Sequence, residues 1–271
     1  MSLVSYYLDS GAGVITLEDG DNGNVLNPES LGSLAKAFSH LNENHEARFI
    51  VIRSRGENFC LGMDLNRVAN AGQIDGLQNI VGVYADLLYA MYTSSKSLVA
   101  LIDGPVKAGG VGIAAACDIV LASENASFEL SEALFGLIPA NVLPYLFSLR
   151  VSPQKARYLV LSAARIDARN AMNIGLVDEV FPRGSFETEA RKVFRRLCRI
   201  SPAAVGEYKK FTSRMLDLPF EQRKEEALHK LLELMKSEET LKAIQNFNEG
   251  LTPSWFSKFK PQKNIVCSEE D

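Results

Sequence analysis

The chain has 271 residues, of which 46% are hydrophobic and 23% charged, and its formal net charge is −4. This composition excludes a disordered polymer, and the acidic balance lacks the basic face of nucleic-acid-binding proteins. No apolar run reaches the roughly 18 residues of a membrane span, and the N-terminus has neither the basic nor the apolar region of a secretory signal. We therefore expect a cytoplasmic protein with no nucleic-acid or membrane partner.

The first fifty residues predict two short strands, a helix and a third strand. Residues 4–8 and 14–17 are short runs rich in β-branched or aromatic residues, separated by a turn composition. Pro28 stands near the start of a helix whose apolar residues recur every three to four positions. Residues 49–52 are all apolar, which is typical of a strand buried on both faces.

The middle of the chain alternates helices with apolar strands. We predict a helix over residues 80–95, strands over 98–102, 118–122 and 127–130, and a small-residue helix opened by the glycines of 109–112. Buried strands alternating with helices indicate βα crossovers. The predicted class is therefore α/β.

The character of the sequence changes at Ser201. Ser201 and Pro202 are suited to the cap and the first turn of a helix, and residues 220–248 are charged and helix-favouring. We predict two domains. Residues 1–200 form the core with the site, and residues 201–271 form a C-terminal helical subdomain that mediates oligomerisation and covers the site.

Cysteine and histidine placement excludes several kinds of chemistry. Cys60, Cys117, Cys198 and Cys267 form no CxxC pair, which predicts buried or incidental thiols rather than a zinc ribbon or a disulfide scaffold. The three histidines lie in or beside charged, helix-like stretches, away from glycine-rich turns. We expect no metal site and no histidine-activated nucleophile.

Two glycine-containing loops can supply backbone N–H donors. Residues 58–64 follow one buried strand, and Gly109-Gly110 follow another and open a helix. The first N–H groups of a helix have no acceptor inside it, and the helix dipole favours negative charge there. Two such donors suit a phosphate or the oxyanion of a thioester enolate. Taken alone, the glycines are better explained by close helix–strand packing.

The order of the motifs resembles the crotonase family, the enoyl-CoA hydratase/isomerase superfamily. The motifs are residues 96–104, 108–112, 117–119, 126–128, Glu132 and 136–139, preceded by 58–64 and followed by 167–168 and 175–180. The resemblance covers roughly residues 4–215. It implies a crotonase-type ββα spiral core with a C-terminal α-helical subdomain, and a homotrimer or a dimer of trimers.

Within this family the chain looks most like the enoyl-CoA-hydratase-like dehydratases of polyketide β-branching cassettes. This likeness rests on residues 106–112, 128–140 and 142–144. It implies a lyase (hydro-lyase) that dehydrates a 3-hydroxy-3-methylglutaryl group on an acyl carrier protein. The only cofactor-like group implied is coenzyme A or phosphopantetheine as the substrate carrier.

The resemblance also assigns site residues. It implies that the N–H groups of Met63 and Gly109 form the oxyanion hole and that Glu132 is the catalytic residue. Gly112 falls where fatty-acid hydratases carry the first of two glutamates, so that carboxylate is missing here. Family isomerases imply that one glutamate can suffice.

The neighbours of Glu132 support its role independently of any family. Phe128, Leu130, Leu134 and Phe135 flank it, and an apolar surrounding raises a carboxyl pKa toward the range suited to general acid–base catalysis.

Four further residues are candidate substrate contacts, namely Asp64, Lys107, Gly110 and Gly112. Asp64 follows an oxyanion donor and is a candidate second polar participant, but the capping habit of aspartate favours a structural role in holding the loop. Lys107 suits a substrate carboxylate or simple exposure to solvent.

Three functions remain open from the sequence. They are an acyl-thioester dehydratase or hydratase, a Δ3,Δ2-enoyl-CoA isomerase, and a catalytically silent subunit that binds thioesters. The retention of Glu132 counts against the last of these.

Overall fold

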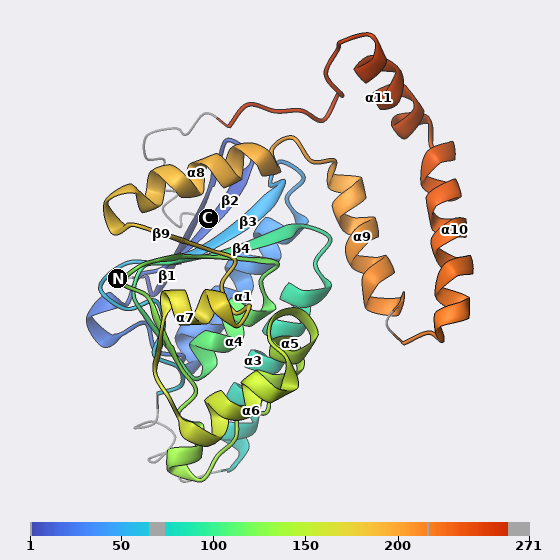
Figure 1. The fold of residues 1–271 in the computed structure, drawn as a ribbon. Helices are drawn as coiled ribbons and strands as arrows, with labels where there is room; N and C mark the ends of the chain where they lie inside the picture. Colours follow the sequence, from blue (N-terminus) through green and yellow to red (C-terminus); the bar gives the residue numbers. More distant parts are fainter. Residues whose placement is uncertain (1, 65–73, 216, 260–271) are drawn as a thin grey trace.

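A computed structural model describes residues 2–64, 74–215 and 217–259 (Figure 1). The main sheet has six strands in the order β1-β2-β3-β4-β6-β9. Only β1 and β2 pair antiparallel, and the other neighbours are parallel. The strands are β1 (Val4–Asp9), β2 (Ala12–Leu17), β3 (Phe49–Ser54), β4 (Ser97–Ile102), β6 (Ile119–Ser123) and β9 (Glu179–Phe181).

A second sheet of three short strands carries the loops of the candidate site. Its order is β5-β7-β8, with β5 (Pro105–Lys107) parallel to β7 (Ser127–Glu129) and β8 (Ile166–Asp167) antiparallel to β7. The helices are α1 (Pro28–Glu43), α3 (Ile74–Thr93), α4 (Gly109–Ala116), α5 (Leu143–Tyr145), α6 (Pro153–Ser162), α7 (Ala168–Asn173), α8 (Phe186–Leu197), α9 (Pro202–Met215), α10 (Phe220–Lys236) and α11 (Glu238–Asn248). This arrangement confirms the predicted α/β class with C-terminal helices.

The main sheet is buried on both faces, as the all-apolar strands predicted. Along β3, Phe49 and Val51 belong to the cluster under α8, whereas Ile50 and Ile52 belong to the cluster shared with α1, α3 and α4 (Figure 1). Successive side chains of a strand point to opposite faces, so a strand between two layers needs an apolar residue at every position.

Helix α4 is the most enclosed element of the core, because all eight of its residues are buried. Glycine and alanine dominate it, which lets the sheet and the neighbouring helices approach its backbone closely. Its position matters for the site, since Gly109 is its first residue.

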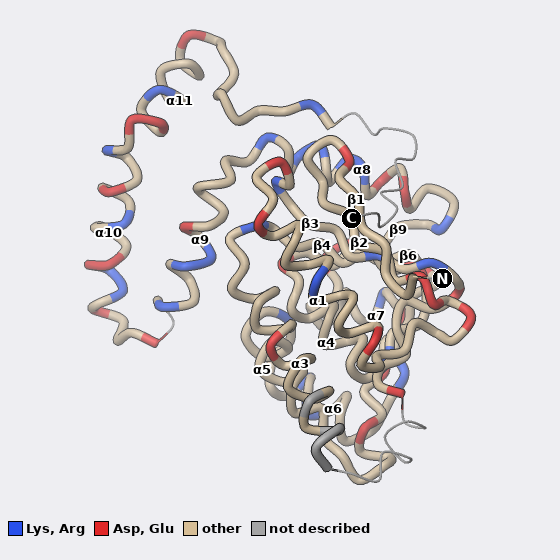
Figure 2. The backbone as a smooth tube through the Cα atoms, turned by 180° about the vertical axis from the view of Figure 1, so that it is seen from behind, with Lys and Arg blue, Asp and Glu red and all other residues tan. Residues whose placement is uncertain are grey.

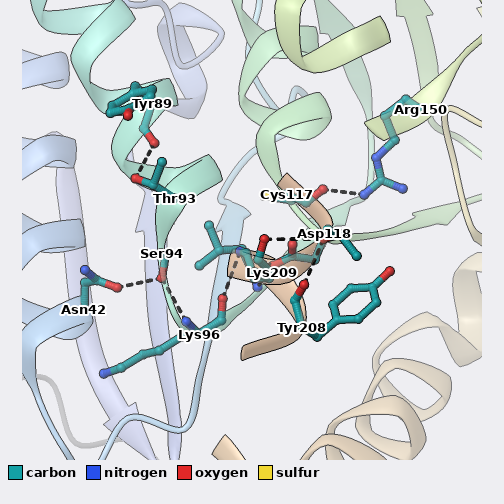
Figure 3. A network of polar contacts seen from close by, with 12 residues as sticks. Asn42, Tyr89, Thr93, Ser94, Lys96, Cys117, Asp118, Arg150, Tyr208 and Lys209 are labelled. Carbon is teal, nitrogen blue, oxygen red and sulfur yellow. Dashed lines mark hydrogen bonds and ion pairs between the residues drawn. The ribbon is translucent and has the colours of Figure 1, made fainter. Parts of the chain in front are cut away.

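A polar network holds the C-terminal end of α4 (Figure 3). Asp118 Oδ2 accepts hydrogen bonds from the Leu98 N–H and from Lys209 Nζ on α9, both at 2.8 Å. The Arg150 guanidinium donates to the carbonyl oxygen of Cys117 and, at 2.7 Å, to Asp178. The side chain of Lys209 is only 12% exposed, so this ion pair ties α9 to the core from a partly dehydrated position.

Helices α9, α10 and α11 form an arm that extends away from the sheets before the chain returns toward α8 (Figure 1). The return is anchored by Arg48, which donates to the carbonyl oxygen of Trp255, to Ser257 Oγ at 2.7 Å and to the carbonyl oxygen of Ile200 at 3.0 Å. Helix α10 has no buried residue. Charges of both signs follow one another along it (Figure 2), and Leu228, Leu231, Leu232 and Met235 are exposed.

Two predicted element boundaries differ from the structure. Helix α3 begins at Ile74 rather than near residue 80. The helix-favouring stretch 220–248 is two helices, because the Ser237 side chain accepts a hydrogen bond from the Thr240 N–H and caps a new helix, α11.

The predicted buried thiols are confirmed for Cys60, Cys117 and Cys198, whereas Cys267 lies outside the described residues. No helix within residues 2–64, 74–215 and 217–259 is both long and apolar enough to cross a membrane.

The Asp118–Lys209 pair generates a stability prediction. We expect Asp118→Ala to lower the free energy of unfolding by about 2–3 kcal/mol, because it leaves the Leu98 N–H without its acceptor and the enclosed Lys209 ammonium without its counter-charge, with only the Lys96 carbonyl oxygen as acceptor. The measurement is urea unfolding followed by circular dichroism. The control is Arg196→Ala, which breaks an exposed ion pair with Glu179 and is expected to cost less than about 0.5 kcal/mol. Equal losses for the two variants would contradict this account.

Candidate active site

The two predicted glycine loops lie against each other. The Lys107 N–H donates to the carbonyl oxygen of Cys60 at 2.9 Å, and the Phe59 N–H donates to the carbonyl oxygen of Pro105 at 3.0 Å. Gly62 has φ +86°, and a Cβ there would lie 2.8 Å from Ala108 Cβ and 3.3 Å from the Gly109 nitrogen. Only glycine combines that backbone angle with so close an approach. Residues 58–64 and Gly109 are therefore brought together as predicted.

Two backbone donors remain available where the loops meet. Around Met63, the Leu26 N–H donates to Gly62 and the Asp64 N–H donates to Leu26. Within the part of the chain that the structure describes, no hydrogen bond uses the N–H of Met63 itself. Gly109 is the first residue of α4, so its N–H has no acceptor inside the helix.

The second donor is held by a strained residue. Ala108 has φ 47° and ψ −117°, which is a rare conformation for a residue with a Cβ. Its N–H donates to the carbonyl oxygen of Glu129 on β7 at 2.9 Å, and its carbonyl accepts from the Val111 N–H at 2.9 Å. Such strain persists only where the surroundings enforce it, and it is concentrated at functional sites.

Glu132 begins a short 3-10 helix, Glu132–Phe135, that follows β7. Its Oε2 is buried, and no side chain or backbone group in the described structure donates a hydrogen bond to it. Burial is the largest influence on this carboxyl and raises its pKa above the ordinary glutamate value. A carboxyl that is easier to protonate near neutral pH suits proton transfer.

The sequence predicted that four apolar neighbours enclose the Glu132 carboxyl, and only half of this prediction is right. Phe128 and Leu130 are buried, as predicted. The prediction that Leu134 and Phe135 also enclose the carboxyl is wrong, because they are 69% and 62% exposed. The 3-10 turn directs these two side chains outward, and sequence adjacency alone does not give that direction.

A tyrosine fills the place beside Gly112. A Cβ on Gly112 would lie 2.0 Å from Tyr84 Oη, so no side chain fits there while the hydroxyl is in place. Tyr84 comes from α3, is 2% exposed, and donates to the carbonyl oxygen of Gly109 at 2.6 Å. Burial raises its pKa first, and the nearby Cys60 and Glu132 raise it further. The sequence motifs did not point to Tyr84, which is one of three tyrosines on an apolar helix that packs against α4.

The other candidate contacts have structural partners. Lys107 Nζ lies 3.1 Å from Glu129 Oε2, and its side chain is 40% exposed. A Cβ on Gly110 would lie 2.4 Å from the Cys60 carbonyl oxygen, so this glycine permits the two loops to touch. The backbone of Asp64 continues the pairing of this loop with Leu26.

The thiol nearest to these donors is unreactive. Burial raises the pKa of Cys60 to about 12, so the thiolate that a nucleophilic mechanism needs is not formed near neutral pH. No group of three or more metal-ligating side chains occurs within the described ranges. The groups left for chemistry are the buried Glu132 carboxyl and the two backbone donors, and a carboxyl with a raised pKa suits proton transfer.

Comparison with known proteins agrees with this geometry. The family model described as enoyl-CoA hydratase/isomerase matches residues 8–258. The chain belongs to this family. It is therefore related to hydratases and dehydratases, and the resemblance found in its sequence motifs is confirmed.

Two curated relatives and one solved structure illustrate the relationship. The bacillaene synthase dehydratase PksH of Bacillus subtilis is 31% identical over 204 residues, which cover 73% of this chain and 76% of PksH. The carnitinyl-CoA dehydratase of Salmonella typhi is 26% identical over 246 residues, covering 89% and 93% of the two chains. The crystal structure of an enoyl-CoA hydratase from Mycobacterium smegmatis has the same fold, with a TM-score of 0.87 at 23% identity and coverage of 94% and 99%.

The raised pKa of Glu132 predicts a pH-dependent effect on stability. A carboxyl whose pKa is higher in the folded than in the unfolded protein destabilises the fold once the pH rises above the unfolded value. We therefore expect the Tm of the Glu132→Gln variant minus the Tm of the parent protein to be more positive at pH 8 than at pH 5. Calorimetry at the two pH values measures this difference. A constant Tm difference would show that the carboxylate is not desolvated.

Proposed function

We propose that the protein dehydrates a β-hydroxyacyl thioester, most specifically a 3-hydroxy-3-methylglutaryl-type group carried by acyl carrier protein or coenzyme A. The observation that carries the proposal is a single desolvated carboxyl, Glu132, in a site where Tyr84 and Gly112 leave no room for a second one. The similarity to PksH, which is named a bacillaene synthase dehydratase, supports the choice of dehydration as the reaction.

The two loops supply the electrostatic part of the reaction. In the proposed complex the thioester oxygen accepts hydrogen bonds from the N–H groups of Met63 and Gly109. Negative charge develops on that oxygen when the α proton leaves, so these donors stabilise the enolate more than the ground state. Gly62 and Gly110 keep the two donors close, and the dipole of α4 adds to the effect.

One carboxyl then performs both proton transfers. Glu132 as carboxylate takes the α proton, and as carboxylic acid it protonates the β-hydroxyl, which leaves as water while the double bond forms. Glu132 ends as a carboxylate, so the cycle is balanced. Because one group reaches both positions, the proton and the hydroxyl leave from the same face and the elimination is syn.

A carboxylate at the far end of the acyl group needs a cation near the mouth of the site. Lys107 is two residues from Gly109 and partly exposed, and its pairing with Glu129 fixes its position without burying it. We assign Lys107 as the cation that pairs with the substrate carboxylate, and we assign Asp64 as a residue that holds the loop.

The role of Glu132 is tested by substitution. We expect Glu132→Gln to lower turnover by about 100-fold or more while thioester binding is retained, since the amide keeps the shape but cannot exchange the proton. Steady-state kinetics and calorimetric titration with the thioester measure the two effects. Glu124→Gln, a change at an exposed glutamate in the turn after β6, is the matched control. Turnover of the Glu132→Gln variant close to that of the parent would remove this mechanism.

The reaction type is tested with a defined substrate. We expect acyl carrier protein bearing a 3-hydroxy-3-methylglutaryl group to lose one water when mixed with the enzyme, as seen by mass spectrometry of the carrier arm. We also expect little or no double-bond migration in a 3-enoyl-CoA. Efficient migration without water loss from any β-hydroxyacyl thioester would favour the isomerase. Binding without either reaction would favour the silent thioester-binding subunit.

We further propose a homotrimer or a dimer of trimers, in which α10 packs against another copy. Its exposed Leu228, Leu231 and Met235 lie on one face, and an apolar face on a helix with no residue buried against its own core calls for a partner surface.

Light scattering tests the oligomer. We expect three or six times the chain mass of 29.8 kDa, and a lower mass when Leu228, Leu231 and Met235 are changed to Glu. Glu226→Lys, on the opposite face of α10, is the control and should leave the mass unchanged. A monomeric parent protein would refute the proposal.

A further inference from the structure

Tyr84 contacts the candidate site at two places, and neither the composition nor the motifs of the chain gave it a role. Its hydroxyl donates to the carbonyl oxygen of Gly109 at 2.6 Å. The same hydroxyl oxygen lies 2.0 Å from the position of a Cβ on Gly112, and its Cζ lies 3.5 Å from that of a Cβ on Gly109. The ring therefore packs along the first turn of α4.

This first turn needs an external restraint. Gly109 and Gly110 are consecutive glycines and have more conformational freedom than any other pair of residues. The preceding Ala108 is strained at φ 47°. Its N–H is fixed by Glu129, and its carbonyl, which shares a peptide with the Gly109 N–H, accepts from the Val111 N–H, but within the described residues no bond from the second sheet holds the next peptide, which joins Gly109 to Gly110. The Tyr84 hydroxyl supplies a restraint from the other side, and it comes from a buried side chain that packing holds in place.

The contact with Gly112 adds a second consequence. Since the hydroxyl and a side chain at position 112 cannot both be present, Tyr84 occupies the space in which a carboxylate from α4 would stand. Glu132 lies close enough to raise the pKa of Tyr84. The tyrosine is therefore a neutral neighbour of Glu132, where a carboxylate would have added a second negative charge.

We infer that Tyr84 is a positioning residue, which orients the Gly109 N–H through its bond to the Gly109 carbonyl and takes the place of a second carboxylate beside Gly112. This inference rests on the proposed function, in which the Gly109 N–H binds the thioester oxygen. Tyr84 acts through Gly109 and needs no contact with the substrate.

The first experiment removes only the hydroxyl. We expect Tyr84→Phe to lower kcat about 3- to 10-fold with little change in KM, because the lost bond matters most when charge develops on the thioester oxygen. Tyr89→Phe removes a hydroxyl from an exposed position of the same helix and should leave kcat unchanged.

A vibrational measurement separates an effect on the orientation of the Gly109 N–H from a simple loss of folded protein. The probe is crotonyl-CoA labelled with carbon-13 at the carbonyl, bound to variants in the Glu132→Gln background. We expect a carbonyl stretch shifted to lower frequency when Tyr84 is present, and a smaller shift with Tyr84→Phe. No shift in either protein would refute the proposed oxyanion hole. A full shift in both would refute the role of Tyr84 and leave the oxyanion hole intact.

A double-mutant cycle tests the contact without any substrate. Gly112→Ala should lower the Tm because its Cβ meets the hydroxyl, and adding Tyr84→Phe should recover more than half of the loss, since the remaining neighbours, Val142 Cγ2 at 3.0 Å and the Tyr84 Cζ at 3.3 Å, lie farther away. Additive effects of the two substitutions would overturn the inference that Tyr84 fills this space.

Discussion

The site depends on the close approach of two backbone segments, Cys60–Gly62 and Lys107–Gly110. They touch without side chains between them, because a Cβ on Gly62 or Gly110 would lie within 2.8 Å or 2.4 Å of the opposite loop. The first loop follows β3, and the second follows β5 and opens α4. Because β3 pairs in parallel with β4, the strand that precedes β5, the chain leaves the main sheet at the same end after both strands, and Cys60 and Val106 form a parallel bridge there. Any side chain at these glycines would separate the two donors.

The same region concentrates groups that do not stabilise the fold. Glu132 keeps a buried oxygen without a donor, Ala108 is strained, and the N–H groups of Met63 and Gly109 make no bond within the described structure. Groups left unsatisfied in this way cost stability, and they persist where a ligand completes them. The apolar layers on both faces of the main sheet offset this cost.

The sequence predicted those parts of the molecule in which local pattern and burial agree. The all-apolar runs at 49–52 and 98–102 are strands between two layers, and the helix from Pro28 has its predicted start. The outward direction of Leu134 and Phe135 was missed because a 3-10 turn does not share the helical period. Tyr84 was missed because its contact with Gly112 depends on how α3 packs on α4, and neither local sequence contains that information.

The arm of α9, α10 and α11 is joined to the core at both of its ends. Lys209 fixes its beginning to Asp118, and Arg48 fixes the returning chain at Trp255 and Ser257, where Phe259 also packs against Phe194. The arm therefore leaves the core and returns to it, and contacts with the core hold both of its ends. A single backbone cleavage at Ser237, between α10 and α11, leaves α9 and α10 covalently joined to the core, so only the contacts of Arg48 and Phe194 then retain the fragment that carries α11.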